Sequence, residues 1–295
     1  MVGLQDFFTL SLSIIIGSLP FIVLGTVLSV VIQNYVPQDK LLRFLPKNSF
    51  LRRIVLSFMG ILLPVCECGN IPLARGLMIR GVSPADATVF LLAAPIVNPI
   101  TIITTYQVFH FSDGILIARI LGGFLIAHII AVILTWQKQQ SRLLTKEMNY
   151  SCNHSHEHKE KENKLSVSLK DFSSEFMKMF KPLVVGAMIA GLIQVLVPKD
   201  ILSSVGRDPV ISIIVMLVLA CVVSICSTVD SFFALAFSNT FSSGAITAFL
   251  LAGPLVDIRM ISMLKTTYTT RTITLIVISV LMLSFIIGEV VNLLG

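Results

Sequence analysis

The sequence has little charge. Only 13% of its 295 residues are Asp, Glu, Lys or Arg, whereas 55% are hydrophobic, and the mean hydropathy is +0.90. Because a soluble domain carries about 25% charged residues, a soluble fold is excluded. No stretch matches the Walker A pattern that cradles nucleotide phosphates. We therefore expect no nucleotide hydrolysis, no cofactor and no enzymatic activity.

Cysteine is also sparse, and its spacing excludes two common uses. The chain has no Cys-x-x-Cys pair, the spacing typical of structural zinc sites and thioredoxin-like proteins. The five cysteines also do not form the framework of a disulfide-rich secreted protein. Any role of the pair Cys66 and Cys68 must therefore come from another chemistry.

Long apolar stretches occupy most of the chain. They cover residues 7–32, 54–65, 85–105, 115–136, 183–197, 210–226, 245–263 and 272–294. Several reach the roughly 20 residues that cross about 30 Å of hydrocarbon. The first has no basic flank and no cleavage site, so it is expected to be a retained span. We predict an all-α, multi-pass protein of the cytoplasmic membrane, in contact with the lipid bilayer and not with nucleic acid.

Basic residues are concentrated in two loops, 37–53 and 137–181. The positive-inside rule places both loops in the cytoplasm. Since 85–105 and 115–136 look like two full spans, the segment 54–81 must enter and leave on the same side. A re-entrant hairpin that breaks at Cys-Glu-Cys-Gly satisfies this, because irregular backbone at membrane depth needs protein or water around it.

Three motifs of the first half recur in the second half at offsets of 159 to 161 residues. They pair YVPQDKLL with LVPKDILS, PVCECGN with SICSTVD, and FLLAAPIVN with FLLAGPLVD. We predict two membrane repeats, 1–136 and 177–295, joined by a charged cytoplasmic linker, 137–176. With about three full spans and one broken hairpin each, the repeats would be inverted, as in secondary transporters. Eight simple spans are the alternative.

The paired motifs predict a shared site where the repeats meet. Its candidate residues are Cys66, Glu67, Cys68, Gly69, Asn70, Pro95, Asn98, Pro99, Cys226, Ser227, Thr228, Asp230, Asp257 and Arg259. Proline interrupts a helix and frees backbone carbonyls, and ionisable side chains inside apolar segments usually face a functional cavity. The alternative is a structural role as helix-joining ion pairs, Glu67–Arg75 or Asp257–Arg259.

The cysteines and acids suggest different roles in this site. Thiolates are soft ligands, so Cys66, Cys68 and Cys226 could together bind a trivalent arsenical or a soft cation. Packing as small hydrophobic groups, or redox work, are the alternatives. Glu67 and Asp230 are the candidates for proton coupling, and Asp230 is expected to face Asn70.

The linker contains Cys152, His154, His156 and His158 in a strongly polar segment. Short His-rich tracts can bind metal ions, and a low content of apolar residues is equally typical of a solvated, mobile linker. We expect residues 137–163 to be mobile and the histidines to be dispensable for transport.

The stretches PVCECGNIPLARGLMIRG and FLLAAPIVNPITI resemble the predicted permeases of the YraQ type, a family that includes the organoarsenical efflux permease ArsP. The resemblance covers nearly the whole chain. It implies a permease, with organic arsenicals as the substrate class of some members. The residues that match the family pattern are Cys66, Cys68, Gly69, Pro95, Asn98 and Pro99.

The sequence thus predicts a secondary permease that exports a small soft metalloid or metal species, coupled to protons. A membrane subunit that works only with a partner protein, and an intramembrane thiol redox protein, are the alternatives. A homodimer is left open.

Overall fold

The computed structural model describes residues 2–37, 40–41, 43, 45–63, 66–111, 114–137, 139–154, 164–196, 208–238 and 240–294. In these residues the regular structure is helical, apart from one isolated bridge between Leu144 and Tyr268. Four helices are long and apolar enough to cross a membrane: α1 (Val2–Tyr35), α7 (Ile115–Thr135), α9 (Lys164–Leu196) and α15 (Thr270–Leu294). The prediction of an all-α, multi-pass membrane protein is confirmed.

Shorter helices lie between the long ones, in the same order in both halves. The first half has α3 (Ser49–Leu62), α4 (Glu67–Ile79), α5 (Pro84–Ala93) and α6 (Pro99–Phe109). The second half has α11 (Pro209–Val223), α12 (Asp230–Leu235), α13 (Ser243–Ala252) and α14 (Ile258–Leu264). This order follows the repeated motifs. The helices α4 and α12 begin within the pair PVCECGN and SICSTVD, and the helices α6 and α14 begin directly after the pair FLLAAPIVN and FLLAGPLVD.

The predicted continuous span over 85–105 is wrong, since residues 94–98 separate α5 from α6. The cause is local. Asn98 caps α6 by accepting a hydrogen bond from the backbone N–H of Ile100, and Pro99 occupies the first helical position. At the matching place in the second half, Asp257 caps α14 through the N–H of Met260.

The predicted breaks near the cysteines are present. The helix α3 ends at Leu62 and α4 begins at Glu67, while α11 ends at Val223 and α12 begins at Asp230. Gly69 is not at the turn itself, however, but in the first turn of α4. Close packing of α1 on α4 at this point depends on Gly25 of α1, since a Cβ there would lie only 2.3 Å from the Gly69 carbonyl oxygen.

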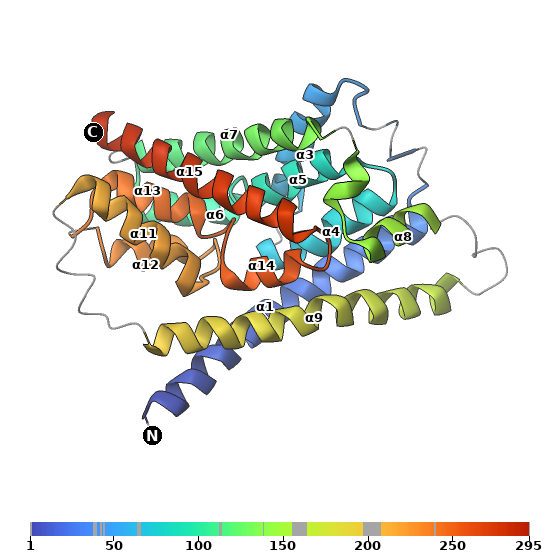
Figure 1. The fold of residues 1–295 in the computed structure, drawn as a ribbon, viewed down its shortest axis with the longest axis horizontal. Helices are drawn as coiled ribbons and strands as arrows, with labels where there is room; N and C mark the ends of the chain where they lie inside the picture. Colours follow the sequence, from blue (N-terminus) through green and yellow to red (C-terminus); the bar gives the residue numbers. More distant parts are fainter. Residues whose placement is uncertain are drawn as a thin grey trace.

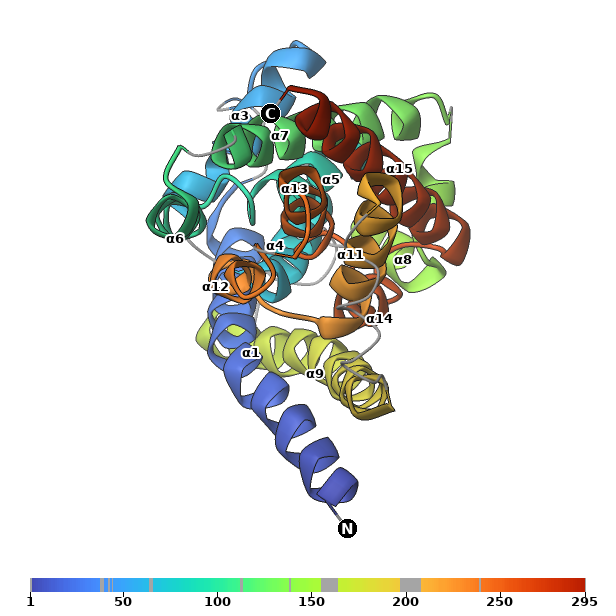
Figure 2. The same cartoon turned by 90° about the vertical axis from the view of Figure 1, so that its left-hand side faces the viewer.

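The two halves run in opposite directions. In Figure 1 the colours show that α1 and α9 are antiparallel, and that α7 and α15 are antiparallel as well. Figure 2, turned by 90°, places α5 and α13 near the middle, with helices of both halves around them. This arrangement agrees with the predicted inverted repeat.

The long helices α1 and α9 break the similarity between the halves. They pack on each other, and α1 packs along α4 while α9 packs along α14. The related helices α12 and α6 pack together without this cover. Consequently Glu67 through Met78 of α4 are buried, whereas α6 and α12 expose apolar side chains such as Ile103 and Phe232.

The linker is partly ordered, so the expectation of a mobile segment is wrong for residues 139–154. The 3-10 helix η2 (Gln140–Leu143) and α8 (Lys146–His154) bury Leu143 and Met148 against the membrane helices. Apolar side chains at these positions account for the docking.

The described residues show no metal site formed by the candidate ligands of the linker, Cys152, His154, His156 and His158. His156 and His158, and the side chain of His154, lie outside the described residues. Burial raises the pKa of the Cys152 thiol, which disfavours the thiolate that binds metal. The helix α9 also begins at Lys164, inside the predicted linker 137–176.

Candidate functional site

Glu67, the first residue of α4, lies at the centre of a buried ionic group. Its side chain is 1% exposed, and its Oε1 atom accepts a hydrogen bond of 2.7 Å from Nη2 of Arg259. The same nitrogen donates to Oδ2 of Asp257 at 2.9 Å. The other terminal nitrogen of Arg259 donates to the Ser18 hydroxyl of α1 at 3.0 Å. Two carboxylates therefore share one guanidinium, far from water.

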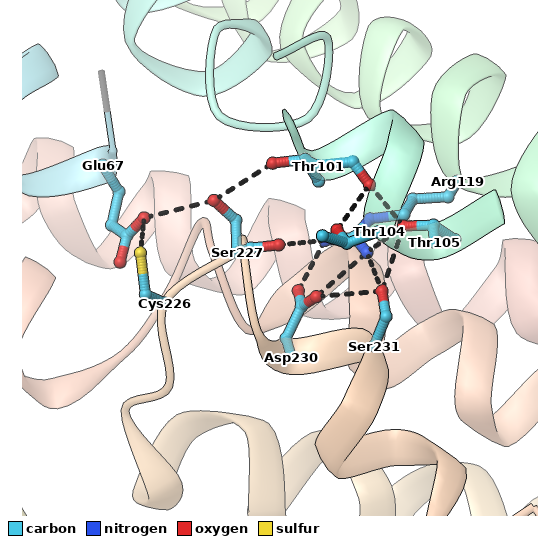
Figure 3. Close-up of polar contacts among 9 residues, drawn as sticks. All are labelled: Glu67, Thr101, Thr104, Thr105, Arg119, Cys226, Ser227, Asp230 and Ser231. Atoms are coloured by element: carbon cyan, nitrogen blue, oxygen red, sulfur yellow. Dashed lines mark hydrogen bonds and ion pairs between the residues drawn. The ribbon is translucent and has the colours of Figure 1, made fainter. Parts of the chain in front are cut away.

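Sulfur atoms from both halves surround the other oxygen of Glu67. The Cys226 thiol donates to Oε2 over 3.6 Å, and the Ser227 hydroxyl donates to it over 3.4 Å, as Figure 3 shows. The ligand atoms of Cys66, Glu67 and Cys226 all lie within 4.8 Å of one another. We call Cys66, Glu67, Cys226, Asp257 and Arg259 the thiol–carboxylate centre. Its sulfur and oxygen donors suit a soft metal or metalloid species.

A second ionic group lies beside the first, on the other side of Ser227 (Figure 3). Arg119 of α7 is 1% exposed and binds both oxygens of Asp230, at 2.5 Å and 3.0 Å. Its Nη1 atom also donates to the hydroxyls of Thr105 and Ser231, at 2.7 Å and 2.9 Å. We call these four residues the arginine–aspartate centre.

Ser227 joins the two centres. Its hydroxyl donates to Glu67 and accepts a hydrogen bond of 3.5 Å from Thr101 of α6. Its backbone carbonyl accepts from Nη2 of Arg119, also at 3.5 Å. Ser227 is therefore hydrogen-bonded directly to a residue of each centre, Glu67 in one and Arg119 in the other.

The predicted pairing of Asp230 with Asn70 is wrong, and of the two alternative ion pairs Asp257–Arg259 is present whereas Glu67–Arg75 is not. Asp230 does not face Asn70, because the charged Arg119 is the stronger partner for a buried carboxylate. Asn70 is fully buried, and neither atom of its amide has a hydrogen-bond partner among the described residues. Arg75 does not pair with Glu67 but with Glu175 of α9, at 2.5 Å.

Cys68 is buried, yet it is not a member of the group of mutually close ligand atoms. Pro95 lies buried in the break between α5 and α6, and Thr228 lies half-buried in the turn before α12. These residues shape the surroundings of the centres. Arg119 is absent from the predicted set. The sequence did contain a sign of it, because Arg119 is a lone arginine in the apolar stretch 115–136, and a charged residue inside a membrane segment usually has a functional or pairing role.

Comparisons with known proteins point to one family. The model of the ArsP_1 family, described as "Predicted permease", matches residues 3–293. The chain is 38% identical over 269 residues to the UPF0718 protein YcgR of Bacillus subtilis, covering 90% of each chain. It is 34% identical over 261 residues to a Streptococcus mutans protein whose name proposes it as a two-component membrane permease complex subunit, covering 88% of this chain and 86% of that one.

A shorter match reaches a third relative. The UPF0718 protein YraQ of Escherichia coli is 29% identical over 111 residues, which is 38% of this chain and 32% of that protein. No solved structure matches the chain.

Proposed function

This chain belongs to the ArsP_1 family of predicted permeases, and we propose that it exports a small thiophilic metal or metalloid species in exchange for protons. The observation that carries the proposal is the buried group of Cys66, Glu67 and Cys226. An ionisable side chain such as Glu67 is costly to keep in an apolar membrane interior and marks a functional position, and thiolates beside it favour soft metals and metalloids.

The place of the site in the fold supports transport. Cys66 and Glu67 come from the start of α4 in the first half, and Cys226 comes from the break before α12 in the second. Transporters with inverted repeats bind substrate near the midplane, where interrupted helices of the two repeats meet. A site shared between the halves changes whenever the halves move relative to each other.

The charges of the site support proton coupling. With Glu67 and Asp257 ionised and Arg259 as their shared partner, the three side chains carry one net negative charge. A buried charge without compensation is expensive, so one proton or one cation should occupy the site at a time. Metal binding to thiols and carboxylates releases protons, which couples the two movements.

The uneven packing of α1 and α9 supports alternating access. In the described residues these helices cover α4 and α14, while the related helices α12 and α6 have no equivalent cover. Alternating access in inverted-repeat transporters is largely a rocking of one group of helices against another around a fixed site. We propose that the α1–α9 pair rocks against the rest of the chain.

The test is transport into proteoliposomes with an imposed pH gradient, with cadmium, zinc, arsenite and a methylated trivalent arsenical as separate probes. Wild-type protein is expected to move at least one probe only when the gradient is present. Glu67→Gln keeps the size and hydrogen bonding of the side chain but cannot release a proton, so gradient-driven transport should fall to background. Transport by this variant at the wild-type rate would refute the proposed coupling.

A second candidate function is that of a subunit in a two-protein permease. It is favoured by the name of the Streptococcus mutans relative, which describes a subunit of a two-component complex. The same reconstitution separates the two candidates. Transport by the purified chain alone contradicts the second, and transport that appears only after adding a co-purified membrane protein supports it.

A further inference from the structure

We infer that the substrate of the thiol–carboxylate centre is a divalent thiophilic cation of the zinc and cadmium class, held by Cys66, Glu67 and Cys226, and not an organic arsenical. This inference rests on the proposed function, because it takes this centre to be the transport site. It adds the identity of the ligand set and the class of the ion.

The spacing of the donor atoms fits such an ion. In a tetrahedral zinc site with usual Zn–S and Zn–O distances, a sulfur and an oxygen ligand lie about 3.6 Å apart. The Cys226 sulfur and Oε2 of Glu67 are 3.6 Å apart, and the Cys66 sulfur is within 4.8 Å of the Cys226 sulfur and of a carboxylate oxygen of Glu67. An ion can therefore enter without a large movement of the protein.

The orientation of Glu67 favours a cation over an arsenical. Its Oε1 atom is held by Arg259, which is in turn held by Asp257 and Ser18, so Oε2 is left to face the Cys226 sulfur. Protein ligands of metals are usually fixed by such an outer set of hydrogen bonds. A trivalent arsenical bonded to carbon and two sulfurs has no position for this carboxylate oxygen.

The burial of the site and the number of its ligands also favour a cation over an organic arsenical. Cys66 is 3% exposed and Glu67 is 1% exposed, so an organic substituent would have to displace protein atoms, whereas a bare ion would not. Three protein ligands leave the fourth tetrahedral position open, as in zinc sites that exchange a ligand. Such a site can release its ion.

Asn70 supplies an independent indication of a polar occupant beside the thiols. It lies one turn after Cys66 and Glu67, on the same face of α4. Its amide oxygen and nitrogen are both buried and without a partner among the described residues. A buried amide of this kind calls for an ordered water or an ion nearby, and water in the open fourth position of the metal would satisfy it.

The test is cadmium titration of the purified full chain in detergent, followed by the ultraviolet absorption of the sulfur-to-cadmium charge transfer. Wild-type protein should bind one cadmium ion, and zinc should compete for it. Cys66→Ser and Cys226→Ser should each remove much of the band, while Glu67→Gln should weaken cadmium binding by about 10–100-fold. Cys221→Ser is the matched control, and it should leave the titration unchanged.

An equal loss in Cys221→Ser and Cys66→Ser would overturn the ligand set. Binding of a methylated trivalent arsenical to wild-type protein without cadmium binding would overturn the ion class and leave the proposed function standing. Gradient-driven transport of neither cadmium nor any arsenical would instead refute the proposed function, whatever the titration shows. If a serine variant does not fold, the Glu67→Gln titration still decides between the cation and the arsenical, because only the cation needs this carboxylate.

Discussion

The thiol–carboxylate centre and the arginine–aspartate centre each take residues from both halves of the chain, yet their charges differ. In the first, Glu67 and Asp257 share Arg259, and thiols lie alongside. In the second, one arginine meets one aspartate, and the arginine also donates to the hydroxyls of Thr105 and Ser231. The first centre has a charge left to neutralise, whereas the second is balanced.

The difference comes from which motif position carries the acid. Glu67 is matched by Ser227, and Asn70 is matched by Asp230, at an offset of 160 residues. Both carboxylates begin their helices, Glu67 in α4 and Asp230 in α12, but they stand at motif positions that differ by three residues. Repeated architecture fixes where polar groups can be placed, and single residues decide whether a position binds a substrate or holds helices together.

The surroundings of the centres differ as well. The helices α1 and α9 cover α4 and α14, while the apolar faces of α6 and α12 carry exposed side chains such as Tyr106 and Leu235. Under the proposed rocking, α1 and α9 would be the helices that close the first centre. Four experiments test the comparison.

Arg119→Met should have the largest effect on stability. It leaves Asp230 buried without a partner, which costs about 3–5 kcal/mol. Adding Asp230→Asn to the same chain should restore most of the loss, because the uncompensated charge is then gone. Thermal unfolding of both variants in detergent measures this. If Arg119→Met unfolds at the wild-type temperature, the second centre is not a structural ion pair.

Glu67→Gln should change the stability little and the transport strongly. Arg259 keeps Asp257 as its partner, so the stability should change by about 1 kcal/mol, close to the value of one hydrogen bond. Gradient-driven transport should nevertheless fall to background. A loss of stability as large as that of Arg119→Met would show that the two centres are alike after all.

Locking α9 to α14 should reduce transport several-fold. A Cβ built on Gly186 lies 3.2 Å from the Cβ of Ser262 and 2.8 Å from the Arg259 Cα. Since disulfides need roughly 3.5–4.5 Å between Cβ atoms, Gly186→Cys with Ser262→Cys should crosslink once α9 has moved slightly away from α14. Transport should fall on oxidation and return on reduction, measured against the reduced double variant.

The matched control crosslinks the two helices that are proposed to move together. Ser11 of α1 lies against Gly191 of α9, so Ser11→Cys with Gly191→Cys joins them without fixing them to α14. This variant should transport under both conditions. Equal inhibition by the two crosslinks would argue against the proposed rocking.

The triple change of His154, His156 and His158 to alanine should have the smallest effect. These residues belong to a polar linker, and neither centre includes them. Initial transport rates should match those of the wild type at every substrate concentration. A raised half-saturating concentration would instead give the linker a role in collecting the ion.

The sequence by itself determined the helices, their breaks and the matched motifs, because these depend on local chemistry. Apolar runs make membrane helices, proline removes a backbone donor, and Asn98 and Asp257 cap the helices that follow them. The structure brings Glu67, Cys66 and Cys226 together, and all three are among the predicted candidates, while their role in binding stays a prediction. The split of 85–105 into two helices followed from the same prolines, but a long apolar run outweighed them.

Only the tertiary structure decided which residues meet. Arg259 reaches Glu67 across 192 positions of the chain, and Arg119 reaches Asp230 across 111. Such partners are set by the angles and offsets at which helices pack, which a sequence pattern does not contain. Cys66 illustrates the reason, because the second sulfur that lies with Cys66 and Glu67 comes from Cys226, in the other half of the molecule.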